Sequence, residues 1–276
     1  MITSLGMLFY WHVRLRKVDM DISEQLLSAL DIIVKEAMKE NAAVAFSGGL
    51  DSGIIAALAG KHGNTTLWTV GSKGSYDVEA SEEMAASMNL PWKHLELSTE
   101  TIENELREMI MLTGTVNPIT LSFEIPLFYV LKYSSQKVIM SGQGADELFL
   151  GYSKYEGLEE DELSDNMKKD LMNLMNVTLK HEKKVADHFG KIMVYPYLDE
   201  RILNIVEEME ISDLAPREVR KAVLRDVAIR MGHPEVAAKP KKAAQYGSGT
   251  MDALRKVAKR NGTTVSGLIS KIAEEL

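Results

Sequence analysis

The chain has 276 residues, of which 45% are hydrophobic and 26% charged, so it can form one sizeable core or one core with an appended lobe. Its net charge of −8 argues against nonspecific nucleic-acid binding by the whole surface, although residues 239–276 carry eight Lys/Arg against three Asp/Glu. The absence of cysteine excludes disulfides, thiolate metal sites and cysteine nucleophiles. On charge alone, the basic segment fits a solvated helical face better than a site for an anionic ligand.

Residues 1–20 are expected to form an N-terminal arm, as a strand or an extended segment. Their short apolar stretch is followed by positive charges rather than preceded by them, and it is too short to span a bilayer. We therefore expect an intracellular, cytoplasmic protein with no membrane partner.

Residues 21–142 alternate between helical and strand patterns. Apolar residues at helical spacing predict an amphipathic helix over 21–40. Short apolar or alternating runs predict strands at 42–46, 65–71, 92–98 and 137–142. Further helices are predicted from about 53 to 61 and at 77–88, 99–114 and 122–135, the last with Pro126 near its start. This alternation predicts an α/β protein with a twisted, mainly parallel sheet and flanking helices.

The strand signal ends after residue 142, and a helical C-terminal lobe is predicted. A long polar helical stretch covers 156–188, and two helices follow at 198–210 and 216–232, the second with Pro216 in its first turn. The last fourteen residues predict an amphipathic helix capped by Thr263 or Thr264. It can pack on the core, pair two subunits as a homodimer, or guide an anionic partner. We expect an α/β region at 21–155 and a lobe at 156–276, packed as one unit.

The hexapeptide "SGGLDS" (47–52) predicts an anion-binding turn. Gly48 and Gly49 allow the backbone to turn its amides inward, the helix that follows adds free N–H groups, and Ser47 and Ser52 add hydroxyl donors. The loop lacks the Gly-Lys-Ser/Thr ending of a Walker A loop. Because Asp51 would repel phosphate, it predicts a bridging Mg²⁺. The alternative is an ordinary strand-to-helix turn with Asp51 as the helix N-cap.

A second glycine-rich turn follows the last predicted strand, in "SGQGADELFLGY" (141–152). Loops at the carboxyl ends of neighbouring parallel strands share one edge of the sheet, so the two turns are expected to converge there. Asp146 is then the natural second Mg²⁺ ligand, with Glu147 close by. Alone, the acidic pair could simply favour the start of a helix.

Together the two turns resemble the synthetase domain of the asparagine synthetases, a branch of the N-type ATP pyrophosphatases with β-lactam synthetase among its relatives. Further segments follow in the family's order: "YPYLDERI" (195–202), "KAVLR" (221–225) and "KPKKAAQYGSG" (239–249). The resemblance covers roughly residues 20 to 250. It implies an adenine nucleotide alpha hydrolase-like fold and an ATP-dependent, AMP-forming ligase that adenylates a carboxylate, with ATP and Mg²⁺ as cofactors.

The resemblance also implies roles for individual residues. Asp51 and Asp146 would bind Mg²⁺, and Lys241 would reach the α-phosphate and stabilise charge there; otherwise Lys241 is a solvated lysine beside Lys242. Glu147 would be a second acid of the catalytic turn. The residues implied to bind ATP are Ala45, Ser47, Gly48, Gly49, Asp51, Ser52, Val70, Gly71, Ser141 and Gly142.

The chain departs from the family pattern in two places that bear on the nitrogen-transfer step. The family carries a glutamate where this chain has Gln143, and a glutamine cannot accept a proton near neutral pH. No glutaminase domain with a catalytic cysteine is present, so the nitrogen is expected from free ammonia, a separate glutaminase subunit or a different amine. The acid substrate would be a small carboxylate, with aspartate as one candidate. The alternatives are a tRNA-modifying enzyme of the PP-loop superfamily, with nucleic acid the less expected partner, and a nucleotide-binding protein without synthetase turnover.

Overall fold

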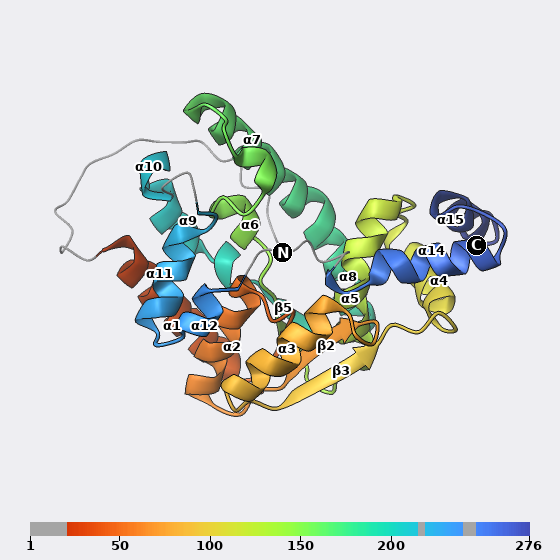
Figure 1. The fold of residues 1–276 in the computed structure, drawn as a ribbon, viewed down its shortest axis with the longest axis horizontal. Coiled ribbons are helices and arrows are strands. Elements are labelled where there is room, and N and C mark those ends of the chain that lie inside the picture. The colour runs from red at the N-terminus through yellow and green to blue at the C-terminus, as the bar shows by residue number, and fades with distance from the viewer. Residues whose placement is uncertain (1–20, 215–218, 240–246) are drawn as a thin grey trace.

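The computed structural model describes residues 21–214, 219–239 and 247–276 (Figure 1). The predicted N-terminal arm, Pro216 and Lys241 lie outside these residues. The sheet has five strands in the order β3-β2-β1-β4-β5, and all neighbouring strands are parallel. The strands are β1 (Ala43–Ala45), β2 (Leu67–Gly71), β3 (Trp92–Glu96), β4 (Val138–Met140) and β5 (Ile192–Val194). The predicted α/β class and parallel sheet are confirmed.

The prediction that no strand follows residue 142 is wrong. Strand β5 pairs with β4, with Val138 opposite Ile192 and Met140 opposite Val194. It has only three residues and lies at the edge of the sheet, where Ile192 is 46% exposed. Its apolar run, Ile192–Val194, is too short to be told from part of a helix by pattern alone, and it lies in the lobe predicted to be helical.

Each strand contributes side chains to two hydrophobic cores, one on each face of the sheet. Val44 and Met140 belong to one core, and their neighbours Ala43 and Ile139 belong to the other. This alternation follows from the two-residue period of a strand. A sheet buried on both faces requires apolar residues on both, which is why its central strands form short apolar runs.

Helices cover both faces, and Figure 1 shows the two groups on opposite sides of the molecule. One group contains α1 (Ile22–Met38), α2 (Leu50–His62), α3 (Tyr76–Ser87), α9 (Glu200–Glu207), α11 (Ala222–Arg230) and α12 (Pro234–Ala237). The other contains α4 (Ile102–Thr113), α5 (Pro118–Tyr133), α8 (Leu179–His188), α14 (Thr250–Arg260) and α15 (Val265–Glu274). Helices from the second half of the chain therefore pack on both faces, and the predicted division at residue 155 stays a prediction. Within the described ranges, no helix has the length and apolar character needed to cross a membrane.

Helix α5 begins four residues earlier than predicted, so Pro126 lies inside it rather than near its start. Asn117 caps the helix, its side chain accepting hydrogen bonds from the N–H groups of Ile119 and Thr120, and Pro118 occupies the first turn. This cap and a proline at the first position favour a start at residue 118.

The long polar stretch is helical as predicted, but its winding changes in the middle. Helix α7 (Glu160–Asn173) continues into α8 through a π-helical turn, η2 (Leu174–Thr178). Such turns are rare and occur frequently at functional sites.

The order of the strands places a switch point between β1 and β4. From β1 the chain adds β2 and β3 on one side, and β4 and β5 lie on the other. In open parallel sheets, ligands bind at such a point, beyond the carboxyl ends of the strands. Both glycine-rich turns follow these two strands.

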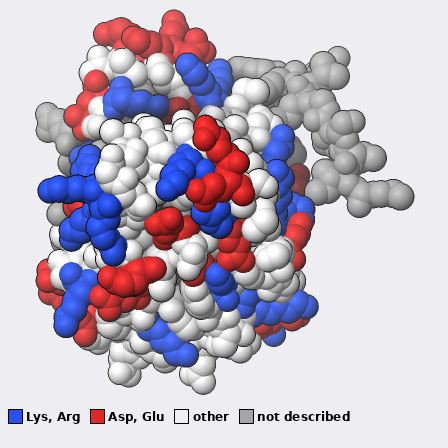
Figure 2. Space-filling model, turned by 90° about the vertical axis from the view of Figure 1, so that its right-hand side faces the viewer, with Lys and Arg blue, Asp and Glu red and all other residues white. Residues whose placement is uncertain are grey.

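Helix α15 packs on the core, the first of the three roles left open by the sequence; the other two stay predictions. Leu268, Ile269 and Ile272 are buried against the core that includes α4, α5 and α14, and Thr264 caps the helix by accepting from the Gly267 N–H at 3.1 Å. On the face of the molecule turned to the viewer in Figure 2, basic and acidic side chains are interspersed. Ion pairs on these helices include Arg107 with Glu275 and Arg255 with Asp252.

We expect Leu268→Ala to lower the free energy of unfolding by about 2–5 kcal/mol, because it opens a cavity in a packed core. Leu268 is 1% exposed. Urea denaturation measures the change. The control is Leu276→Ala, since Leu276 is 54% exposed and should cost less than about 1 kcal/mol. Equal effects at both leucines would contradict the packing of α15.

Candidate functional site at the carboxyl edge of the sheet

The first turn joins β1 to α2 and is held closed by its own serines. The Ser47 N–H donates to Ser52 Oγ at 3.2 Å, and the two hydroxyl oxygens also lie 3.2 Å apart. Helix α2 begins at Leu50 rather than near residue 53, with Gly49 as its N-cap. Asp51 is therefore not the cap but lies in the first turn of the helix. The first amides of α2 have no partner within the helix and give this turn its capacity to bind an anion.

Gly48 is required for two independent reasons. Its φ of +71° lies in the left-handed region, and a Cβ there would lie 2.6 Å from the backbone nitrogen of Ser81. Helix α3 thus packs directly against the turn. Any residue with a Cβ at position 48 would clash with this helix.

The second turn joins β4 to the short helix α6 (Ala145–Leu148) and touches the first turn. A Cβ built on Gly142 would lie 3.1 Å from the Cβ of Asp51 and 3.4 Å from the Ser52 nitrogen. The two turns are therefore in van der Waals contact, although 94 residues separate Gly48 from Gly142 in the chain. Tyr197, which is fully buried, donates a hydrogen bond to the Asp51 carbonyl at 3.0 Å and ties a third segment to the same place.

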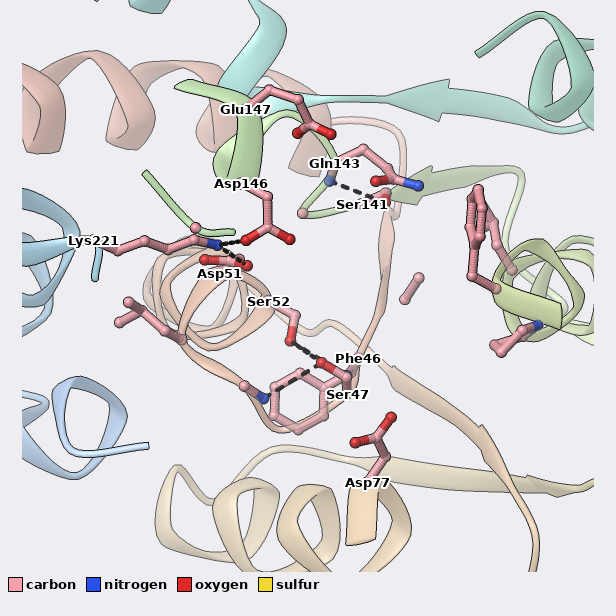
Figure 3. Close-up of a pocket in the computed structure, with 18 of the residues that line it drawn as sticks. Phe46, Ser47, Asp51, Ser52, Asp77, Ser141, Gln143, Asp146, Glu147 and Lys221 are labelled. Carbon is pink, nitrogen blue, oxygen red and sulfur yellow. Dashed lines mark hydrogen bonds and ion pairs between the residues drawn. The ribbon is translucent and has the colours of Figure 1, made fainter. Parts of the chain in front are cut away.

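A buried lysine that was not predicted from the sequence joins the two acidic side chains. Lys221 Nζ lies 2.6 Å from Asp51 Oδ2 and 2.5 Å from Asp146 Oδ1, and the lysine side chain is 3% exposed (Figure 3). Burial lowers the pKa of Lys221, but Asp51 and Asp146 outweigh burial and raise the pKa above its ordinary value. The lysine is therefore charged and compensates two carboxylates in a poorly solvated place.

Asp51 and Asp146 also fit the requirements of a Mg²⁺ site. Both carboxylates contact one ammonium nitrogen, so they are close enough to share one cation. Asp51 Oδ1 is buried and has no hydrogen-bond partner among the described residues, and two carboxylates remain one negative charge in excess of Lys221. Within the same residues, no group of three or more His, Cys, Asp or Glu could hold a metal alone. Mg²⁺ commonly takes one or two carboxylates and completes its shell with phosphates and water.

Both turns line one cavity with a volume of 720 Å³, and most of the predicted site residues line it. These residues are Ala45, Ser47, Gly48, Gly49, Asp51, Ser52, Val70, Ser141, Gly142, Gln143, Asp146 and Glu147. Gly71 does not line the cavity: it is packed against Ser75, Val78 and the Ser248 carbonyl. Lys241 lies outside the described residues, so its place stays a prediction.

The cavity has a basic wall that was not predicted from the sequence. Arg220, Arg225 and Lys239 line it together with Lys221. The Arg225 guanidinium donates to the carbonyls of Ala237 and Lys239 and so fixes the segment that precedes residue 240. The segment "KAVLR" contains Lys221 and Arg225, but nothing in its sequence shows that either side chain faces a ligand.

The opposite wall is formed by α5, the second turn and the π-helical turn. Phe123, Leu127, Leu174 and Thr178 line this part of the cavity. In Figure 3, Gln143 and Glu147 lie at one end of the view and Ser47 and Asp77 at the other, with Asp51 and Asp146 between them. Glu147 is buried and accepts a hydrogen bond from the Tyr152 hydroxyl at 2.6 Å. Burial raises the pKa of Glu147, with Asp146 adding to the increase and the Tyr152 hydrogen bond opposing it.

Two more buried acids, Glu124 and Glu182, lie behind this wall. Burial, reinforced by Glu182, raises the pKa of Glu124 to about 8. His181 Nδ1 lies 3.1 Å from Glu124 Oε1, and burial, together with Lys184, lowers the pKa of His181. At neutral pH the contact is therefore a neutral hydrogen bond, in which the Glu124 hydroxyl donates to His181 Nδ1, rather than an ion pair.

The fold and the site together define an α/β protein in which two glycine-rich turns meet at the switch point of a parallel sheet. The asparagine synthase family model matches residues 25–164 and 156–267, and the chain belongs to this family. The predicted resemblance is confirmed, and the match extends beyond the expected end near residue 250.

Two relatives show how much of a longer protein the chain matches. It is 32% identical over 255 residues to a protein of Methanocaldococcus jannaschii provisionally named glutamine-hydrolysing asparagine synthetase 1, covering 78% of this chain and 47% of that protein. It is 24% identical over 259 residues to the glutamine-hydrolysing asparagine synthetase B of Escherichia coli, covering 85% of this chain and 47% of the relative. The chain thus spans about half the length of these relatives.

Among solved structures, NMN synthetase from Francisella tularensis is similar to the chain with 13% identity and a TM-score of 0.45, covering 92% of each chain. This likeness is below the level at which a shared fold can be concluded.

Replacing Lys221 with methionine should lower the free energy of unfolding by about 3–5 kcal/mol when divalent cations are absent, because two close carboxylates lose their buried cation. Mn²⁺ or Mg²⁺ should restore part of the loss by taking the place of the ammonium. Urea denaturation with EDTA and with each metal measures both effects.

The matched control is Lys61→Met. Lys61 is 64% exposed and pairs with Asp31, so its loss should cost less than about 1 kcal/mol and should not respond to metal. A Lys221 variant as stable as the parent protein would show that the ammonium does not hold the turns together.

The buried pair of Glu124 and His181 should make the free energy of unfolding depend on pH. Because the pKa of Glu124 is raised from 4.5 to about 8, the folded protein keeps a proton that the unfolded chain releases between these values. The free energy of unfolding should therefore fall as pH rises across this window. Glu124→Gln mimics the protonated form, and we expect a smaller difference between pH 6 and pH 8.5 in urea denaturation. Glu79→Gln, at an exposed position on α3, should retain the full difference.

Proposed function

We propose that the chain is an ATP-dependent, AMP-forming ligase that adenylates a small carboxylate and transfers the acyl group to an amine or ammonia, without hydrolysing glutamine itself. The observation that carries the proposal is the direct contact of the two turns, with Asp51 and Asp146 sharing the Lys221 ammonium in one cavity. Membership of the asparagine synthase family supports a ligase of this type. Aspartate is the first acid to test.

The first turn would hold the pyrophosphate part of ATP. Its helix N-terminus and the Ser47 and Ser52 hydroxyls supply donors for phosphate oxygens, and Arg220, Arg225 and Lys239 add positive charge on the facing wall. Val70, Trp68 and Phe46 line the cavity where β1 and β2 end and would contact the base and ribose. Ser141 and Gly142 would lie beside the nucleotide.

Asp51 and Asp146 would hold Mg²⁺, which when bound neutralises phosphate charge and orients the triphosphate. Lys221 would keep the two carboxylates in place and balance their excess charge. Lys241 would stabilise charge at the α-phosphate: Lys239, two residues earlier, lines the cavity, and Gly247 packs against Asp77 on its rim. Attack of a carboxylate on a phosphate brings two anions together, so cations are required at that point.

The acid and the nitrogen nucleophile would bind at the other end, beside Gln143 and Glu147. The reaction joins the acid's oxygen to the α-phosphorus and releases pyrophosphate. The nitrogen then attacks the acyl carbon, the bond between that carbon and the AMP oxygen breaks, AMP leaves with the electron pair, and the nitrogen loses its proton to water. The nitrogen would come from free ammonia, another amine or a separate glutaminase subunit.

Pyrophosphate–ATP exchange tests this proposal against the two alternatives. Exchange that requires a free amino acid such as aspartate, followed by trapping with hydroxylamine, supports the ligase. Exchange that requires tRNA supports an RNA-modifying enzyme; the interspersed charges of Figure 2 offer no continuous basic surface on that face. Binding of ATP without exchange under any condition supports a nucleotide-binding protein without turnover.

Asp146→Asn should reduce exchange at least about a hundredfold, because it removes a charge that holds the cation and orients Lys221. Initial rates of label incorporation into ATP measure the effect. Asp252→Asn, which changes a 70%-exposed carboxylate on α14, should leave exchange unchanged. Full activity in the Asp146 variant would refute the metal assignment.

A further inference from the structure

Gln143 stands where the family carries a glutamate, and its side-chain amide is held by a hydrogen bond to a buried carboxylate. Gln143 Nε2 donates to Glu182 Oε1 at 2.9 Å, and the Tyr195 hydroxyl donates to Glu182 Oε2 at 2.6 Å. Glu182 is 3% exposed. Three segments therefore meet here: the second turn, helix α8 and the residue that follows β5.

The hydrogen bond to Glu182 shows which end of the amide faces the cavity. The amino end of Gln143 is directed at Glu182, and this arrangement suits the ionised form of the carboxyl, which only accepts hydrogen bonds. Gln143 lines the cavity, and its carbonyl oxygen is then the end left to interact with a ligand. A glutamine without this partner could present either end.

Two further carboxyl groups and a tyrosine hydroxyl face Glu182. Glu147 on α6 and Glu124 on α5 face it, Glu124 is bonded to His181, and Tyr195 contributes only a hydroxyl. Within the described chain, no lysine, arginine or histidine forms an ion pair with Glu182. The Gln143 carbonyl oxygen accepts hydrogen bonds, so this end of the cavity favours a ligand that has N–H donors.

We propose that Glu182 is a positioning residue that holds the Gln143 carbonyl oxygen toward the cavity, where it accepts a hydrogen bond from the attacking nitrogen of ammonia or a primary amine. This inference rests on the proposed ligase function. Gln143 does not take the proton that the nitrogen loses; it orients the nitrogen toward the acyl carbon, a contribution made by geometry rather than by basicity. Glu182 and Gln143 act only in the second half-reaction, in which the acyl group is transferred to nitrogen. Adenylation takes place at the other end of the cavity.

The decisive experiment compares the two half-reactions in wild type and Glu182→Gln. Pyrophosphate–ATP exchange with aspartate should stay within about threefold, because it does not use the nitrogen site. Formation of the hydroxamate from hydroxylamine should fall about tenfold or more, with a higher KM for hydroxylamine, which is the effect of losing about one oriented hydrogen bond. Glutamine at 182 preserves the shape of the side chain, and circular dichroism checks that the variant is folded.

The pH profile separates positioning from a purely structural role. Burial, with Glu147 adding and the Tyr195 and Gln143 hydrogen bonds opposing, raises the pKa of Glu182 to about 7. Below this value the protonated acid can donate to the Gln143 carbonyl and turn the amide around. Hydroxamate formation in wild type should therefore rise through an apparent pKa near 7 that is missing in the variant.

A second variant keeps the proposal open to refutation if Glu182→Gln is poorly folded. Gln143→Leu removes the amide, should show the same selective loss of transfer, and should make Glu182→Gln cause no further loss in the double variant. The proposal is overturned if transfer is unchanged, or if exchange and transfer fall together. If wild type shows no exchange with any acid, the proposed function fails, and this inference fails with it.

Discussion

The Lys221 ammonium, shared by Asp51 and Asp146, is the interaction on which the geometry of the site depends. It joins the first turn of α2, the second glycine-rich turn and the residue before α11, and it lies where the chain switches direction across the sheet. Lys221 adopts φ +58°, a conformation that costs a residue with a side chain roughly 1–2 kcal/mol. That cost is offset because the lysine satisfies two carboxylates that would otherwise repel each other in a buried position. Glycine allows this approach from several sides: a side chain at Gly151 would collide with the Asp146 carboxylate, and one at Gly142 would press on Asp51.

The charges of the cavity are unevenly distributed along its length. Most donors and cations surround the first turn and the basic wall, although Asp77 lies at this end. The other end is bordered by Glu147, with Lys154 beside Tyr152. Phosphate groups need the cations at the first end, and a nitrogen that gains positive charge as it attacks the acyl carbon is stabilised by acceptors at the other. The π-helical turn contributes Leu174 and Thr178 to the lining of the cavity. Glu182 follows about one turn later, in α8.

The sequence was sufficient to predict the parts of the site that are local. Each turn contains its glycines, hydroxyls and acids within a few residues, and the alternation of strands and helices placed both turns at one edge of the sheet. It could not identify Lys221, which lies 170 residues from Asp51 and precedes a helix like many other lysines. Strand β5 was missed because three half-exposed residues carry little periodic signal, and the start of α5 was misplaced because a proline suggested a first turn. The same limit hid Glu182, since only the packing of α8 against the second turn brings its carboxylate to Gln143.

The buried acid behind the second turn gives a physical reason for the glutamine at position 143. A glutamate there would place a second carboxyl within hydrogen-bonding distance of Glu182, with Glu147 and Glu124 also nearby. Two carboxyls at that distance cannot both ionise, so one would keep a proton near neutral pH. Glutamine retains the hydrogen bond and removes the repulsion. In this chain the carboxylate of the network lies on α8, where it contacts the Gln143 amide. Glutamine at position 143 therefore keeps its amino group bonded to that carboxylate and turns its carbonyl oxygen to the cavity.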